Sequence, residues 1–198
     1  MVTICLLRHG ETQYNADGNR YCGRTNVPLT AKGVSQAERV RELLKDYSFD
    51  AIFCSPLSRA KNTAEIASNN YGNIQVDNRL IEVDFGEWEG KRPEDFQSED
   101  PESWHNWLDN PAENRAGRTG ETATEIINRL NSFYNELIQK YDGKTVLVVG
   151  HNGINRFFMA YNLGMPLKNY RRIVQDNSAL TLLTLSPNSG INLLKLNA

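Results

Sequence analysis

The alternation of short apolar runs with amphipathic helical segments constrains the fold of this chain more than any other feature. The runs are four to seven residues long and occupy residues 2–7, 50–55, 73–76 and 144–150. Such runs are typical of strands, and KTVLVVG at 144–150 has the unbroken apolar character of a strand buried on both faces. Strands that alternate with helices predict an α/β fold, a three-layer α/β/α sandwich on a mostly parallel sheet.

Local signals mark where the helices begin and how the chain ends. Thr30 is a suitable N-cap for a helix, and Ser55 is placed to cap the next one with Pro56 in its first turn. An apolar stripe at helical spacing predicts a further helix over 121–141. Near the C-terminus, two apolar runs flank SPNSG at 186–190, which predicts a hairpin.

The regular pattern disappears between residues 84 and 120, which contain all three tryptophans of the chain. A long segment without periodicity inside a compact domain is usually functional or disordered, and the tryptophans argue against disorder. We therefore expect an irregular lid with one short helix around 101–108. Trp104 and Trp107 either pack the lid or stack on a ring-bearing substrate.

Composition limits the class of protein. The 198 residues predict a single domain over 1–198, and 22 Lys+Arg against 24 Asp+Glu give a net charge of −2. This balance favours neither a nucleic acid nor an anionic membrane as partner. The three cysteines form no CxxC pair, and no run reaches the length of a membrane helix. We expect a cytoplasmic protein with reduced thiols.

Polar residues directly follow three of the predicted strands. Arg8 and His9 come after the first strand, Arg59 lies just beyond the second, and His151 follows the run at 144–150. In parallel α/β sheets, ligands bind beyond the carboxyl ends of the strands, so these residues should face one crevice. Arginine presents a planar fork of donors that suits phosphate oxygens, so the cluster predicts a site for a phosphate dianion.

The chemistry of this cluster favours phosphoryl transfer over metal binding. Arginines beside two histidines repel a metal cation, so we expect no metal and no other cofactor. One imidazole can instead attack phosphorus while the other, charged, stabilises the phosphate oxygens. Such a reaction needs a proton donor for the leaving oxygen, and the candidates are Glu82 and Asp84 in RLIEVDFGEWEG.

Four segments of the chain resemble the signatures of one known family. They are LLRHGETQYN, CSPLSRAKNTAE, LIEVDFGEWEG and VLVVGHNGINR, in that order. Together they resemble the histidine phosphatase superfamily, also called phosphoglycerate mutase-like proteins, over about residues 3–156. The resemblance implies that His9 is the nucleophile and forms a phosphohistidine, and that Glu82 protonates the leaving alcohol and then activates water.

The same resemblance assigns the binding residues. It implies that Arg8, Arg59 and His151 clamp the phosphate. Other residues expected to contact phosphate or line the pocket are Asn15, Cys22, Gly23 and the backbone N–H of Asn152. Family members often have Gly after the second histidine, whereas this chain has Asn152. This difference leaves the role of the Asn152 side chain open.

The branch of the family follows from the lid. Mutases of this fold carry longer insertions and basic residues after the acidic glutamate, whereas here Val83 and Asp84 follow Glu82 and the lid is short and acidic. We therefore expect a phosphatase acting on a small-molecule phosphomonoester, similar to the α-ribazole phosphatase type of cobalamin assembly. The alternatives are a phosphoglycerate mutase-type phosphoryl transfer and a non-catalytic phospholigand-binding module. The oligomeric state is left open.

Overall fold

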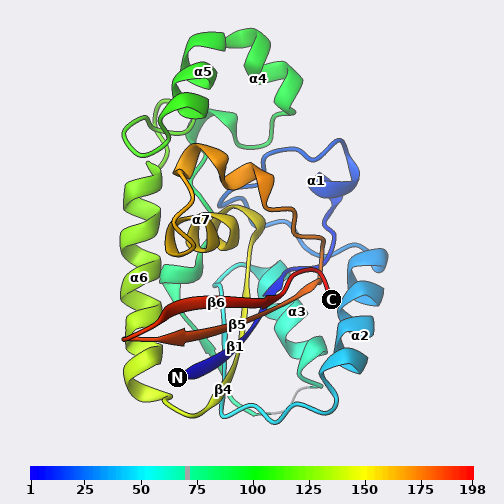
Figure 1. Ribbon diagram of the computed structural model, residues 1–198. Coiled ribbons are helices and arrows are strands. Elements are labelled where there is room, and N and C mark those ends of the chain that lie inside the picture. The colour runs from blue at the N-terminus through cyan, green and yellow to red at the C-terminus, as the bar shows by residue number, and fades with distance from the viewer. Residues whose placement is uncertain (70–71) are drawn as a thin grey trace.

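A six-stranded sheet lies at the centre of the computed structural model, which describes residues 1–69 and 72–198 (Figure 1). The strand order is β3-β2-β4-β1-β5-β6, in which β1 to β4 pair in parallel while β5 and β6 are antiparallel. The strands are β1 (Val2–Arg8), β2 (Ala51–Cys54), β3 (Ile74–Val76), β4 (Thr145–Gly150), β5 (Leu180–Ser186) and β6 (Gly190–Lys195). The predicted mostly parallel sheet and its C-terminal hairpin are confirmed.

Helices cover both faces of this sheet. The α-helices are α1 (Gln13–Ala16), α2 (Ala31–Leu44), α3 (Ser58–Ala67), α4 (Pro93–Glu99), α5 (Pro101–Asp109), α6 (Ala123–Lys140) and α7 (Asn152–Asn162). The described residues also form the 3₁₀ turns η1 (Asn78–Leu80), η2 (Gly86–Trp88) and η3 (Leu167–Arg172). On one face Leu7 of β1 shares a buried cluster with Val40 of α2, and on the other Leu6 shares one with Phe157 of α7. The predicted three-layer α/β/α sandwich is confirmed.

The register of the parallel strands brings their carboxyl ends together. Arg8 of β1 pairs with Gly150 of β4, and Cys54 of β2 pairs with Val149. The backbone N–H of His9 donates to the carbonyl of Gly150 over 3.1 Å, which continues the ladder one residue beyond the strand. The residues that follow these three strands therefore meet at one edge of the sheet.

The expected cap of α3 is wrong. Leu57 occupies the N-cap position and α3 begins at Ser58, three residues after Ser55. The Ser55 hydroxyl instead accepts from the Leu57 N–H over 3.3 Å and lies 2.7 Å from Nε2 of His151. Leu57 is extended, with φ −76° and ψ 139°, and the residue before a proline is biased away from helical backbone, so the helix does not begin directly after Ser55. By contrast, Thr30 caps α2 as expected, accepting from the N–H of Gly33 over 3.0 Å.

The lid over 84–120 is more regular than expected. It contains the predicted short helix as α5, but also α4, which the sequence analysis missed (Figure 1). Pro93 occupies the first turn of α4, and Asp95 accepts from the N–H of Arg92. Phe96 is the one buried residue of α4, so its sequence has no apolar stripe. Without a stripe at helical spacing, the sequence pattern does not predict this helix.

Aromatic packing holds the lid together. The Trp88 and Phe96 rings stack at 4.9 Å between centroids, and Trp104 meets Trp88 edge-on at 5.6 Å. Trp107 is fully buried and contacts Phe157 of α7, which ties the lid to the body of the molecule. These contacts correspond to the packing alternative for the lid tryptophans. In the described part of the chain, no helix is both long and apolar enough to cross a membrane.

We expect Leu6→Ala to lower the free energy of unfolding by about 2–5 kcal/mol, because it leaves a cavity in the core between the sheet and α7. Leu6 is 0% exposed, whereas Leu194 on the edge strand β6 is 54% exposed. The matched control Leu194→Ala should therefore change stability by no more than about 0.5 kcal/mol. Urea denaturation followed by circular dichroism measures both, and equal losses would contradict this account of the core.

Candidate active site

A cavity of about 460 Å³ opens where the parallel strands end. It is lined by eight of the nine residues predicted for the site, namely Arg8, His9, Asn15, Cys22, Gly23, Arg59, Glu82 and Asn152. The ninth, His151, is fully buried and contacts the lining residue Arg59. The structure thus brings together side chains that are up to 144 positions apart, from Arg8 to Asn152 (152 − 8 = 144).

His9 presents an unprotonated nitrogen to the cavity. Its Nδ1 lies 2.6 Å from the carbonyl oxygen of Gly10, a contact in which Nδ1–H donates and the Nε2 lone pair stays available. Burial, together with the positive charges of Arg59 and Arg8, lowers the pKa of His9 well below its ordinary value of 6.5. The imidazole is therefore neutral at neutral pH, which is the form that acts as a nucleophile.

Two guanidinium groups flank this imidazole. Arg59 is 0% exposed to solvent, and its Nη1 and Nη2 donate to the carbonyls of Thr25 and Gly23 over 2.8 and 2.7 Å. Arg8 is fixed by a 2.7 Å bond from Nη1 to the carbonyl of Gln175. Each fork is held in place before any ligand arrives and retains further N–H groups for an anion.

The loop that holds Arg59 is itself fixed by a glutamate that the sequence analysis missed. The Glu89 carboxylate accepts from the N–H groups of Arg24 and Thr25 over 2.8 and 3.1 Å. A Cβ on Gly23 would lie 2.0 Å from Oε1 of Glu89, and Gly23 has a φ of +49°. Glycine is required at this position by both the close approach and the backbone conformation.

His151 is neutral in the ligand-free molecule, which differs from the charged imidazole expected. Its Nδ1 accepts from Nε of Arg59 over 3.3 Å, so Nε2 carries the proton that Ser55 accepts. Burial and the positive charge of Arg59 lower the pKa of His151 well below 6.5. The rings of His9 and His151 lie 5.1 Å apart between centroids.

Glu82 is positioned by the first turn of α7. Its Oε1 accepts from the N–H groups of Val83 and Ile154 over 2.9 and 3.1 Å, and its Oε2 accepts from Gly153 over 3.1 Å. A carboxyl oxygen has two lone pairs, so Oε2 retains one for a proton. A Cβ on Gly153 would come within 2.7 Å of Oε1, so glycine at this position leaves room for the carboxyl group.

Asp84, the other candidate acid, is differently placed. Its Oδ1 accepts from the N–H of Gly86 over 2.9 Å, and its Oδ2 pairs with Arg24 at 3.3 Å. Among the described residues that line the cavity, Glu82 is present and Asp84 is not. The geometry therefore favours Glu82.

Comparison with known proteins identifies the family. The family model "Histidine phosphatase superfamily (branch 1)" matches residues 4–198. The chain belongs to the histidine phosphatase superfamily. The predicted family and the expected enzyme class, a phosphatase, are confirmed.

The relatives of this histidine phosphatase include proteins named as phosphatases and proteins named as mutases. The adenosylcobalamin/alpha-ribazole phosphatase of Escherichia coli is 36% identical over 164 residues, covering 82% of this chain and 80% of the relative. The probable phosphoglycerate mutase GpmB of Salmonella choleraesuis is 35% identical over 182 residues, covering 91% and 84%. A crystal structure of a putative alpha-ribazole-5'-P phosphatase from Escherichia coli superposes with a TM-score of 0.87 at 31% identity, covering 100% and 96%.

The remaining predicted residues of this histidine phosphatase offer polar groups of different kinds. Asn15 Oδ1 accepts from the N–H of Thr12 over 3.1 Å and from Nδ2 of Asn177 over 3.3 Å, so the Asn15 amide nitrogen is left for a ligand. Asn152 Oδ1 is buried at the cavity and has no hydrogen-bond partner among the described residues. Burial raises the pKa of the Cys22 thiol to about 11, so it is protonated at neutral pH.

The outer wall of the cavity comes from residues that the sequence analysis did not single out. They include Tyr21, Phe85, Arg156, Tyr170 and Arg171. The segment between α7 and β5 shows no periodicity that would have exposed Tyr170 or Arg171. Arg156 carries a weak signal, because it lies one helical turn after Asn152 and so shares its face of α7. Across residues 1–69 and 72–198, no group of three or more His, Cys, Asp or Glu could hold a metal ion.

We expect both active-site imidazoles to titrate at a pH below 6.5 in the ligand-free enzyme. The reason is that burial and the neighbouring arginines disfavour the charged form of each ring. Each ring therefore stays neutral until the pH falls below 6.5, the ordinary pKa of a histidine. Ring ¹⁵N NMR titration measures the midpoints, and the His9→Ala variant assigns the His9 signals. A midpoint at or above 6.5 for either ring would contradict the electrostatics described here.

Proposed function

We propose that this histidine phosphatase hydrolyses a small-molecule phosphomonoester through a phosphohistidine on His9. The observation that carries the proposal is a neutral imidazole with a free Nε2, held at a strand end between two guanidinium groups. A metal cofactor plays no part in the proposed steps, because the two guanidiniums supply the positive charge.

In the first step the phosphate group binds to Arg8 and Arg59, with further donors from Asn15 and from the backbone N–H of Asn152. Nε2 of His9 attacks phosphorus as the ester P–O bond breaks. The proton on Oε2 of Glu82 passes to the leaving oxygen, so the product leaves as a neutral alcohol. Preorganised arginines stabilise the charge that accumulates on the phosphate oxygens.

In the second step Glu82 acts in the opposite sense. Its carboxylate accepts a proton from water while the water oxygen attacks phosphorus and the N–P bond breaks. Inorganic phosphate leaves, His9 returns to its neutral form, and Glu82 is again protonated. One carboxyl group therefore serves both half-reactions, which requires it to stay on the same side of the phosphate.

His151 contributes once a phosphate dianion is present. A dianion between the arginines opposes the positive potential that keeps His151 neutral, and so favours its protonation. The added proton goes to Nδ1, so the bond from Nε of Arg59 breaks, and the charged imidazole then adds to the clamp formed by Arg8 and Arg59. The hydrogen bond between His151 Nε2 and Ser55 keeps the ring in place in both states.

The relatives suggest which compounds to test. The name of the Escherichia coli relative makes α-ribazole 5′-phosphate the first candidate substrate. A phosphoglycerate mutase-type transfer is the second candidate, supported by the name of the Salmonella relative. In a mutase the phosphohistidine passes its phosphate to an organic acceptor rather than to water.

We place the protein in the cytoplasm as one domain over 1–198, with neither nucleic acid nor membrane as partner. Support comes from the cysteines, since Cys5, Cys22 and Cys54 are all free thiols. Reduced thiols are typical of cytoplasmic proteins. The net charge of −2 provides no broad basic surface.

Phosphate release in the presence of EDTA tests the mechanism. We expect the wild type to release phosphate from p-nitrophenyl phosphate and from at least one natural compound in a panel. The panel comprises α-ribazole 5′-phosphate, 3-phosphoglycerate, phosphoserine and sugar phosphates. His9→Ala should abolish release, and rapid quenching of the wild type should trap an acid-labile phosphoenzyme. Release that persists in His9→Ala would refute the phosphohistidine, and isomerisation with a bisphosphate primer that outpaces release would favour the mutase.

We expect Glu82→Gln to lose less of the wild-type kcat than His9→Ala. General acid–base catalysis contributes about 10²- to 10⁴-fold, whereas the His9 variant has no nucleophile at all. The amide oxygen can still accept from the N–H groups of Val83 and Ile154, and only the bond from Gly153 is lost, so the local fold should be retained. Steady-state kcat measured for both variants decides the ranking. An equal or larger loss in Glu82→Gln would overturn it.

A further inference from the structure

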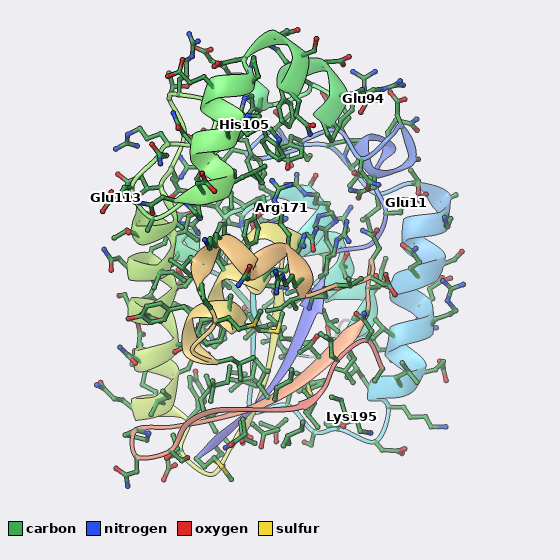
Figure 2. The ribbon with its side chains drawn as sticks, turned by 45° about the horizontal axis from the view of Figure 1, so that its top comes forward. Glu11, Glu94, His105, Glu113, Arg171 and Lys195 are labelled. Atoms are coloured by element: carbon green, nitrogen blue, oxygen red, sulfur yellow. The ribbon has the colours of Figure 1, made fainter. Side chains whose placement is uncertain are left out.

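The cavity holds more positive charge than a phosphate group requires. A phosphate dianion carries two negative charges, which Arg8 and Arg59 together balance. The same cavity is also lined by Arg156 of α7 and by Arg171 of η3. Figure 2 shows Arg171 below the lid helices, near the middle of the molecule.

Neither of these two arginines has a negative partner in the described structure. The ion pairs formed within 4.0 Å by the described residues include neither Arg156 nor Arg171. The carboxylates that line the cavity belong to Glu82 and Asp176. Glu82 is engaged by backbone N–H groups, and Asp176 lies exposed at the rim.

The groups that hold these arginines are all neutral. Arg156 donates from Nε to the carbonyl of Tyr170 over 3.3 Å and from Nη2 to the carbonyl of Arg171. Arg171 donates to the hydroxyls of Tyr170 and Tyr21 over 3.1 and 2.6 Å. Its guanidinium also lies over the Trp104 ring at 4.4 Å. For both arginines, Nη1 donates to no described residue, so two forks are held in place with N–H groups to spare.

Holding two like charges in a partly buried site has an energetic cost. Burial lowers the pKa of Arg156, and the neighbouring positive charge of Arg171 lowers it further, whereas Tyr170 and Tyr21 raise the pKa of Arg171 in spite of its burial. Partly buried charges in proteins are normally paired with an opposite charge. Where such charges line a ligand cavity, an anion on the ligand can provide that pairing. Planar guanidinium forks match a carboxylate or a phosphate in particular.

We infer that Arg156 and Arg171 form a second anion subsite, so that the preferred substrate is a phosphomonoester whose alcohol part carries another acidic group, a carboxylate or a second phosphate. This inference rests on the proposed function, since it describes the leaving group of the same reaction. It ranks compounds with a second acid above α-ribazole 5′-phosphate, whose nucleoside part has none.

Pairs of substrates that differ in one group test the inference. 3-Phosphoglycerate and glycerol 1-phosphate differ only by a carboxylate in place of a hydroxymethyl group. Glucose 1,6-bisphosphate and glucose 6-phosphate form the corresponding pair for a second phosphate. We expect the wild-type kcat/KM to favour the acidic member of one pair by about tenfold to a hundredfold, as hydrogen bonds to a charged group imply. The pair with the larger ratio identifies the acid.

Four variants assign that preference to the arginines. Arg171→Gln and Arg156→Gln should each bring the ratio within the pair towards one. Arg171→Lys keeps the charge but loses the planar fork over Trp104, so its ratio should lie between those of the wild type and Arg171→Gln. Arg172→Gln is the matched control, because Arg172 is the exposed neighbour of Arg171 and does not line the cavity. It should leave the ratio unchanged. Circular dichroism checks that each variant is folded.

The outcomes separate the two proposals. No phosphate release from any compound, including p-nitrophenyl phosphate, would refute the proposed function. Release that depends on His9 but shows a ratio near one for both pairs would refute the second anion subsite alone. So would a kcat/KM for α-ribazole 5′-phosphate above that for every compound with a second acid. A ratio that stays at the wild-type value in both Arg171→Gln and Arg156→Gln would show that these arginines do not form the subsite.

Discussion

The parallel pairing of β1 with β4 is the constraint on which the rest of the site depends. Arg8 pairs with Gly150, and the N–H of His9 adds one more bond to the carbonyl of Gly150. Because side chains alternate along a strand, a slip of one residue would turn His9 away from the cavity. The strands are buried on both faces, so apolar packing fixes this register strongly. The two imidazoles lie side by side as a result of that packing.

The protonation state of His9 and His151 follows from how the charge of Arg59 is buried. Arg59 is held inside the protein by backbone carbonyls and not by a carboxylate, so its charge is left for the ligand. Burial, together with that uncompensated charge, keeps His9 and His151 neutral. The same arrangement that suits a dianion therefore also keeps His9, the proposed nucleophile, unprotonated. Arg156 and Arg171, in the outer part of the cavity, are likewise held by neutral groups and not by carboxylates.

The lid connects substrate recognition to the core. Tyr21 packs against Phe85 and Phe96, with ring centroids at 4.5 and 4.8 Å, and accepts a hydrogen bond from Arg171. The fully buried Trp107 anchors the same aromatic cluster on α7. The outer wall of the cavity is thus part of a continuous aromatic packing. A relative with different lid aromatics would place its recognition groups differently on the same catalytic centre.

The sequence by itself determined the layers of the fold and the inner part of the site. Strand-length apolar runs and helical stripes act locally, so they can be recognised without coordinates. Residues such as His9 and His151 directly follow strands, where chain order alone predicts a shared crevice. The tertiary structure decided the rest. Ser55 supports His151 and not α3, Glu89 holds the loop under Arg59, and Arg171 reaches the cavity. These contacts join distant segments that carry no periodicity, and only packing brings such segments together.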